Sequence, residues 1–374
     1  MASSAAISAS ANDRAHMEAA LGLARRALGE VWPNPAVGCV LVKDGRVVGR
    51  GCTAAGGRPH AETAALARAG AAARGATAYV TLEPCSHHGR TGPCADALIT
   101  AGVGRVVAAI EDPDPRVSGR GLARLRDAGV QVELGLCAEA AAELNAGFFC
   151  RVCRGRPLVT VKVATSLDAC IATRGGESKW ITGAAARAAG HRLRAEADAI
   201  LVGSGTALAD NPELTCRLPG MQHRSPVRLV IDGHLRLPLT SKLVATARRI
   251  PTWVITHGGN DVDRLGALAD CGVEVIEVAA TVGGNTDLGA AFAELGRRGL
   301  TRLLVEGGAH LTAALLRAGL VDRLAWFRAP MLLGGDGIPA VTGFGIEHLD
   351  EAPRFERLSV AELGGDLFEY LTRV

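Results

Sequence analysis

The sequence has few aromatic residues, almost no excess charge and no long apolar run. Aromatic residues make up 3% of its 374 residues, which leaves little to stack on nucleic-acid bases. Lys and Arg number 41 against 38 Asp and Glu, a net charge of +3, so we expect no electrostatic attraction to nucleic acid or to an anionic membrane. No apolar run approaches the length of a membrane span. We therefore expect partners that are neither nucleic acids nor membranes.

The length of the chain predicts two domains, because single hydrophobic cores stop growing at about 250 to 300 residues. The first residues, MASSAAISASANDR, are small and polar and lack the apolar core of a signal peptide. We expect a disordered tail over residues 1–11. The ten cysteines are scattered along the chain, which favours a reducing cytoplasm over a disulfide framework.

The most informative stretch is the triplet HAE at 60–62 followed by TLEPCSHHGRTGPC, which ends at Cys94. His60, Cys85 and Cys94 would give zinc three protein ligands and leave the fourth position for water, as in catalytic zinc sites. Zinc deaminases of bases carry H-x-E and then P-C-x-x-C, with the Glu as proton carrier. Here eight residues, 86–93, separate the cysteines, so a longer loop must join the ligands. Each residue alone could be a packed core residue, but together they favour zinc.

The predicted chemistry is hydrolytic deamination. Zinc lowers the pKa of bound water from 15.7 to about 7. This shift lowers the free energy of forming hydroxide by roughly 12 kcal/mol. Glu62 is the candidate that carries the proton to a ring nitrogen and then to departing ammonia. Residues two apart on a helix point roughly 200° away from each other. His60 and Glu62 can therefore flank one site only if a helix begins at or near His60.

The first part of the chain alternates strands and helices, which indicates a layered α/β sheet. Asn12 or Asp13 can cap the first helix, and Asp44 and Gly45 fit a two-residue hairpin turn. The predicted elements are a helix over 12–28, strands over 37–43 and 46–51, a helix over 60–73, a strand over 76–82, a helix opening near Cys94, and strands over 103–110 and 130–134 with helices to about 150.

Residues 150–157, CRVCRGRP, are the predicted linker. Cys150 and Cys153 within it fit a helix terminus better than a redox pair. The alternation then resumes from Leu158 and includes strands over 199–203, 227–231, 252–256, 273–278 and 302–305. Gly307 and Gly308 follow the last of these strands. Their amides could receive phosphate at a helix start, although a tight turn explains them equally well.

The first half resembles the deaminase half of the bifunctional riboflavin-biosynthesis deaminase-reductase. The resemblance rests on NPAVGCV from Asn34, on HAE, on TLEPCSHHGRTGPC and on DPDPRVSGRG from Asp112. It implies a cytidine-deaminase-like three-layer domain over 12–150 that deaminates a diaminopyrimidinone bearing phosphoribosylamine. It also implies that Asn34 contacts the pyrimidine and that His87 and Arg90 hold the phosphate. Without the family, Asn34 could be an Asn-Pro turn and Arg90 a solvated charge.

Two positions of this half depart from the family. Arg90 stands where many members have Lys, which keeps the charge but offers a planar fork. Asp114 replaces a common Asn, which puts a hydrogen-bond donor role at this position in question.

The second half resembles the reductase half of the same enzyme. KVATSLD, GESKWIT, the Arg194 helix, TALADNPELTCR and VEGG follow in order. The resemblance implies a dihydrofolate-reductase-like domain over 157–374 that uses NADPH. The implied substrate residues are Lys162, Asp168, Ser178, Arg194, Leu214, Arg217 and Glu306. The implied cofactor residues are Ala164, Trp180, Thr206, Asp210, Gly308, Ala309, His310, Leu311, Thr312, Ala313 and Ala314.

Purely structural interpretations of residues in this half stay open. Trp180 could be a core aromatic and Arg194 a charge on a helix face. Ala169 replaces the family's usual Gly after Asp168, which puts the backbone geometry there in question.

The sequence therefore predicts an enzyme of two steps, a zinc-dependent deamination and a reduction of the ribosyl group to ribityl by NADPH. The family resemblance also implies a homo-oligomer. The alternatives are a nucleoside or tRNA deaminase with an appended non-catalytic binding domain, and a degenerate protein that only binds or assembles. Near-neutral charge and few aromatics count against the first, and the intact set His60, Glu62, Cys85 and Cys94 against the second.

Overall fold

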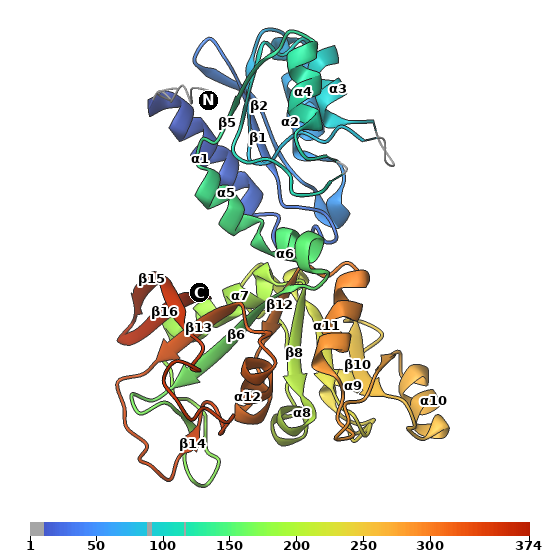
Figure 1. The fold of residues 1–374 in the computed structure, drawn as a ribbon, viewed down its shortest axis with the longest axis vertical. Helices are drawn as coiled ribbons and strands as arrows, with labels where there is room; N and C mark the ends of the chain where they lie inside the picture. Colours follow the sequence, from blue (N-terminus) through green and yellow to red (C-terminus); the bar gives the residue numbers. More distant parts are fainter. Residues whose placement is uncertain (1–10, 88–91, 116) are drawn as a thin grey trace. The chain divides into compact units, whose positions relative to one another are not determined.

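The computed structural model describes residues 11–87, 92–115 and 117–374. The chain forms two compact units, Met1–Gly155 and Arg156–Val374, each with its own sheet (Figure 1). Of the predicted tail, only Ala11 lies within the described residues, and it opens a helix. Among the described residues, no helix combines the length and apolar character needed to cross a membrane.

The first unit is built on a five-stranded sheet in the order β2-β1-β3-β4-β5. Strand β1 is antiparallel to β2 and β3, and β3, β4 and β5 are parallel. Its strands are β1 Gly38–Lys43, β2 Arg46–Cys52, β3 Thr77–Val80, β4 Arg105–Ala108 and β5 Gln131–Leu134. Its helices are α1 Ala11–Arg25, α2 Ala61–Ala69, α3 Cys94–Thr100, α4 Arg120–Asp127, α5 Ala138–Leu144 and α6 Ala146–Arg154, with 3-10 turns at Ala55–Gly57 and Gly70–Ala73.

Helices cover both faces of this sheet, so the unit has three layers. Because successive strand residues point to opposite faces, Val40 of β1 packs with α1 and α5, while Leu41 packs with α2, α3 and α4. The predicted helices and strands are all present, with ends shifted by about a turn or less. Asp44 and Gly45 have φ of 50° and 73°, as a type I′ hairpin turn requires.

The predicted cap of the first helix was wrong. Helix α1 already begins at Ala11, and Asp13 is buried inside its first turn. The Asp13 carboxylate accepts hydrogen bonds from Arg105 Nη1 at 2.9 Å and from the Tyr79 hydroxyl at 2.5 Å. The Asp13 carboxylate therefore binds Arg105, which is distant in sequence, instead of capping the backbone of the helix.

The predicted linker was also partly wrong. Helix α6 continues to Arg154, and Gly155 ends it with φ 70°, a backbone conformation that glycine adopts without strain. Only a few residues then separate α6 from the first strand of the second unit, which begins at Leu158. Cys150 and Cys153 both lie in the second half of α6, as the helix-terminus interpretation predicted.

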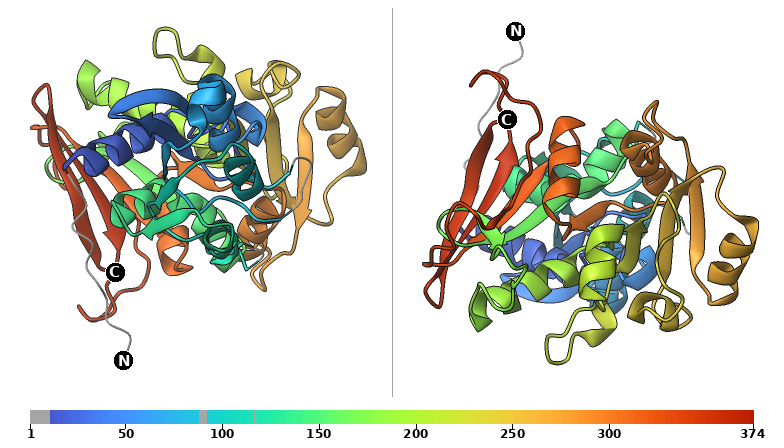
Figure 2. Two further views of the ribbon diagram at one scale, coloured as in Figure 1. Left: turned by 90° about the horizontal axis from the view of Figure 1, so that it is seen from above. Right: turned by 90° about the horizontal axis from the view of Figure 1, so that it is seen from below.

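The second unit is built on a nine-stranded sheet in the order β11-β10-β9-β8-β12-β6-β13-β16-β15. The strands from β11 to β13 are parallel, and β16 and β15 are antiparallel additions at one edge. Figure 2 shows these red C-terminal strands at one edge of the sheet and the gold strands at the other. The strands are β6 Leu158–Thr165, β8 Ala199–Gly203, β9 Val227–Ile231, β10 Thr252–His257, β11 Glu274–Val278, β12 Arg302–Val305, β13 Arg323–Arg328, β15 Phe355–Leu363 and β16 Asp366–Arg373, and β7 Cys170–Ala172 pairs with β14 Ile338–Pro339.

The helices of this unit follow the parallel strands and pack on the sheet. Strands such as β8 are buried on both faces, as expected of parallel strands covered by helices. One core joins α7, α8, α9 and α10 to strands β8, β9, β10 and β12. The helices are α7 Ala184–Glu196, α8 Ser204–Asp210, α9 Lys242–Ala245, α10 Val262–Asp270, α11 Leu288–Arg297 and α12 Ala309–Arg317, with a 3-10 turn at Gln222–Arg224.

Candidate functional site

The three predicted metal ligands converge in the first unit. His60 is the N-cap of α2, Cys94 is the first residue of α3, and Cys85 lies in the loop after β3. His60 Nδ1 lies 3.3 Å from Cys94 Sγ and 3.7 Å from Cys85 Sγ. A tetrahedral zinc with bonds of about 2.0 Å to nitrogen and 2.3 Å to sulfur would place these atoms about 3.5 Å apart. The donor set therefore fits zinc.

The site has three protein ligands rather than four. All three donor atoms lie within 4.8 Å of one another, and no further His, Cys, Asp or Glu of the described ranges joins the group. The hydrogen bond between the two thiols lowers the pKa of Cys85 and raises that of Cys94. Three ligands with space for a fourth are typical of catalytic zinc rather than structural zinc.

Glu62 lies in the first turn of α2, next to His60, as the sequence predicted. Its side chain is buried, with 3% of the residue exposed. Burial, followed by the charge of Cys85, raises the pKa of Glu62 to about 7. A carboxyl group with such a pKa can take up and release a proton near neutral pH, which general acid-base catalysis requires.

His60, Cys85 and Glu62 line a cavity of about 250 Å³. The predicted residues Asn34 and His87 also line it, whereas Arg90 lies outside the described residues. Gly57, at φ 84°, makes room for Asn34, because a Cβ at this position would lie 1.9 Å from Asn34 Nδ2. The cavity wall also contains polar residues that sequence reasoning did not assign to the site, namely Thr53, Arg58, Glu83, Asp112 and Arg151.

Glu83 organises one wall of this cavity. Its buried carboxylate accepts hydrogen bonds from four backbone N–H groups, those of Asp112, Gly119, Gly121 and Leu122, at 2.8 to 3.2 Å. These bonds join the segment that carries Cys85 to the segment 112–122. Asp112 and Asp114 reach the cavity from that second segment. Burial is the main cause that raises the pKa of Asp112 to about 6.

A second cavity, of about 640 Å³, lies in the second unit. The structure brings nine of the predicted reductase residues to its wall. These are Lys162, Ala164, Ser178, Trp180, Arg194, Asp210, Leu214, Arg217 and Glu306. Its wall also contains Lys179, Arg187 and Lys242, cations that the sequence did not lead us to assign to the site. A lining rich in cations suits ligands that carry phosphate groups.

An ion pair fixes the floor of this cavity. Arg194 of α7 holds Glu306 with two parallel hydrogen bonds of 2.7 and 2.8 Å. Burial alone would raise the pKa of Glu306, but the Arg194 charge outweighs it and lowers the pKa to about 2. Glu306 is therefore a fixed negative charge at any working pH.

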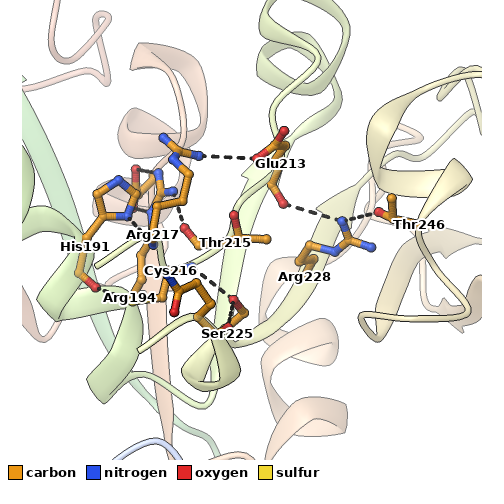
Figure 3. A network of polar contacts seen from close by, with 11 residues as sticks. His191, Arg194, Glu213, Thr215, Cys216, Arg217, Ser225, Arg228 and Thr246 are labelled. Carbon is orange, nitrogen blue, oxygen red and sulfur yellow. Dashed lines mark hydrogen bonds and ion pairs between the residues drawn. The ribbon is translucent and has the colours of Figure 1, made fainter. Parts of the chain in front are cut away.

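The irregular segment 211–217 forms another wall and is held by side chains from several elements (Figure 3). Arg194 Nη1 donates to the Thr215 carbonyl at 3.0 Å, and the Arg217 N–H donates to His191 Nδ1 at 3.4 Å. Arg228, almost fully buried in β9, donates to the Glu213 carbonyl at 3.4 Å and to Thr246 Oγ1 at 2.8 Å.

His191 acts as a neutral acceptor in this network. Burial, with the charges of Arg194 and Arg217, lowers its pKa to about 4. Its ring nitrogen can therefore receive the Arg217 N–H across the neutral range of pH.

Other predicted cofactor residues lie at the start of α12, outside the lining of this cavity. The Gly308 N–H donates to Thr206 Oγ1 at 3.2 Å, and Gly308 is the N-cap of α12, which carries His310, Leu311, Thr312, Ala313 and Ala314 after Ala309. A Cβ on Gly307 would lie 2.7 Å from Leu311 Cδ2, so a larger residue there would require the Leu311 side chain to move. Backbone N–H groups at the start of a helix can bind a phosphate of a dinucleotide. Gly307, Gly308 and the start of α12 therefore fit NADPH.

The structure does not bring Asp168 to the second cavity. Its carboxylate accepts hydrogen bonds from the N–H groups of Leu333 and Gly334, at 3.1 and 2.7 Å. The Ser166 hydroxyl contacts it as well. Asp168 thus fixes the connection after β13, and its role beside the reacting sugar stays a prediction. The neighbouring Ala169 has φ 61°, the left-handed conformation for which glycine is suited.

Comparison with known proteins agrees with both halves. Residues 10–110 match the family model described as cytidine and deoxycytidylate deaminase zinc-binding region, and residues 157–368 match the RibD C-terminal domain. The riboflavin biosynthesis protein RibD of Escherichia coli K12 is 43% identical over 375 residues, covering 96% of this chain and 99% of the relative. That of Aquifex aeolicus is 41% identical over 361 residues, covering 96% and 98%.

Solved structures agree as well. A structure of Acinetobacter baumannii RibD has a TM-score of 0.86 and 38% identity, covering 97% of this chain and 99% of that one. A Thermotoga maritima structure described as a diaminohydroxyphosphoribosylaminopyrimidine deaminase and 5-amino-6-(5-phosphoribosylamino)uracil reductase has a TM-score of 0.84 and 33% identity, with the same coverage. The predicted fold class and family are confirmed, and the chain belongs to the riboflavin biosynthesis protein RibD family.

Proposed function

We propose that this chain carries out two successive reactions of riboflavin biosynthesis. The first cavity deaminates 2,5-diamino-6-(5-phosphoribosylamino)pyrimidin-4-one, and the second reduces the ribosyl side chain of the product to ribityl with NADPH. The observation that carries the proposal is the convergence of His60, Cys85 and Cys94 beside the buried Glu62. Membership of the RibD family and the name of the Thermotoga maritima relative support the substrates.

In the first reaction, His60, Cys85 and Cys94 hold the zinc. Zinc supplies the Lewis acidity that makes water a nucleophile at neutral pH. Glu62 would carry one proton of the attacking water to the ring nitrogen and then the second, from the hydroxyl so formed on carbon, to the amino group, which leaves as ammonia. Asn34 faces the pyrimidine, and His87, with Arg90, holds the phosphate tail.

In the second reaction, NADPH supplies the hydride to C1′ of the open-chain ribosyl group, and the protein supplies binding and orientation. Arg194, Arg217, Ser178 and Leu214 line the phosphoribosyl substrate from the wall of the cavity. Lys162 faces the reacting sugar and is drawn toward the fixed charge of Glu306.

We further propose that the enzyme works in the cytoplasm as a homo-oligomer. All ten cysteines are free thiols, which suits a reducing compartment. Light scattering of the purified protein checks the oligomeric state.

A coupled assay tests the proposed function. The purified protein is given the diaminopyrimidinone phosphoribosyl substrate with and without NADPH, while ammonia and the absorbance of the nicotinamide are followed. We expect ammonia in both cases and NADPH oxidation that begins only after deamination. Ammonia release without any NADPH oxidation would remove the reductase half of the proposal, and the absence of ammonia would remove the deaminase half.

A further inference from the structure

Trp180 is an exposed aromatic residue at the wall of the second cavity. Its exposed fraction is 65%, although it lines the cavity. It lies in the irregular segment between β7 and α7. An indole left in water has apolar faces to offer to a planar ligand. By itself, however, such a side chain would be free to adopt several rotamers.

Arg187, in the first turns of α7, restrains this indole. Its guanidinium carbon lies 4.7 Å from the centroid of the Trp180 ring, within the range of a cation-π contact. Its Nη1 also donates a hydrogen bond of 2.6 Å to the Thr182 carbonyl. Arg187 therefore holds both the ring and the backbone that follows it.

The base of the segment is anchored separately. The Gly183 N–H donates to Asp366 Oδ2 at 2.6 Å, and Asp366 is buried. Within the described part of the chain, no carboxylate forms an ion pair with Arg187. Arg187 takes no part in the hydrogen bond between Gly183 and Asp366. The contacts of its guanidinium are with the Trp180 ring and the Thr182 carbonyl.

We propose that Arg187 is a positioning residue that orients Trp180 so that the indole packs against the flat nicotinamide of NADPH. The inference rests on the proposed function, in which Trp180 faces the cofactor. The guanidinium over the ring restrains the indole before the cofactor arrives, so less conformational entropy is lost on binding. The simpler alternative is that Arg187 is a bare cation that binds a phosphate group directly.

Binding measurements separate these roles. We would measure the dissociation constants of NADPH, from its own nicotinamide fluorescence, and of 2′,5′-ADP, by calorimetry, for the full chain and for Arg187→Ala. The second ligand has the adenosine phosphates but no nicotinamide. We expect Arg187→Ala to weaken NADPH roughly 2- to 30-fold, as a cation-π contact predicts, and to leave 2′,5′-ADP unchanged. Arg192→Ala, on the same helix and paired at i,i+4 with Glu196, is the matched control.

A double-mutant cycle tests whether Arg187 acts through Trp180. In a Trp180→Ala background, Arg187→Ala should cause no further loss of NADPH affinity. Arg187→Lys keeps the charge and a donor for Thr182 but lacks the planar group, so its NADPH affinity should fall between those of the wild type and Arg187→Ala. This variant also covers the case in which Arg187→Ala fails to fold.

Three results would overturn the inference. They are an equal loss of 2′,5′-ADP affinity, a full effect of Arg187→Ala in the Trp180→Ala background, and wild-type NADPH affinity in both Arg187 variants. A wild-type chain that binds no NADPH would instead contradict the proposed function.

Discussion

Glu62, which is buried, and Glu306, whose side chain is 13% exposed, lie one in each cavity, and their surroundings shift their pKa values in opposite directions. Burial raises the pKa of Glu62 to about 7, whereas the Arg194 charge lowers the pKa of Glu306 to about 2. Glu62 can exchange a proton near neutral pH, but Glu306 stays ionised. The first group therefore suits proton transfer, and the second suits the placement of a fixed charge beside the substrate.

His191 should make the stability of the chain depend on pH. Its pKa is lowered from 6.5 to about 4 in the folded state, by burial and by Arg194 and Arg217, so the unfolded chain takes up the proton first as the pH falls. Stability should therefore decrease as the pH falls from about 6.5 to 4. Urea unfolding across this range should show a smaller decrease for His191→Gln than for wild type. A decrease of the same size in both would contradict this, and His348→Gln, in an exposed loop, is the control.

Ala169 should be a strained position. It has φ 61°, which costs a residue with a Cβ roughly 1–2 kcal/mol, whereas glycine loses about 0.5–1 kcal/mol more chain entropy on folding. Ala169→Gly should thus raise the free energy of unfolding by up to about 1.5 kcal/mol, measured by urea unfolding. The same change at Ala318, where φ is −76°, should destabilise the protein. A loss of stability in Ala169→Gly would show that the strain is absent.

At the scale of elements, local signals predicted most of the structure. The hairpin at Asp44 and Gly45, the helix after His60 and the helix at Cys94 follow from turn residues and from the geometry that zinc needs. The C-terminal strands β13, β15 and β16 were not predicted. Strand β13 pairs with β6, and β16 pairs with β13, so their places in the sheet depend on segments far away in sequence. The Asp13 cap failed for a similar reason, since Arg105 is 92 residues away.

The same division applies to the sites. Residues within motifs were predicted as site residues: His60 and Cys85 lie close together in the first unit, and Arg194 and Glu306 form an ion pair in the second. Glu83, Arg187 and His191 were not assigned, because they act through backbone groups and side chains that only the folded chain brings near them. For Glu83, its place in the TLEPC motif was the only signal available from the sequence.

Glu83 should hold the segment 112–122 against the zinc ligands. Glu83→Ala leaves four N–H groups without their acceptor. We expect a loss of about 2–5 kcal/mol in the free energy of unfolding, because each buried unsatisfied group costs about 1–3 kcal/mol and some will be reached by water. The KM for deamination should also rise, since Asp112 and Asp114 move with the segment. Glu111→Ala removes a neighbouring, more exposed carboxylate that contacts Ser118 and should change neither quantity; equal effects of the two variants would contradict the assignment.

At the scale of the whole molecule, each cavity belongs to one unit. The lining of the first comes from residues 33–152 and that of the second from residues 162–307, on either side of the boundary at Gly155. The two reactions should therefore be separable. Removal of zinc with a chelator should stop ammonia release and leave NADPH oxidation of the deaminated substrate intact. Loss of both activities on chelation would contradict this independence.

The most direct test of the account is the Glu62→Gln variant of the full chain. Zinc content, ammonia release and NADPH oxidation with the already deaminated substrate are measured on one preparation. The account predicts one zinc per chain, a loss of roughly 10²- to 10⁴-fold in the rate of ammonia release, and an unchanged rate of NADPH oxidation. Ammonia release at the wild-type rate would contradict the role of Glu62 as the proton carrier beside the zinc.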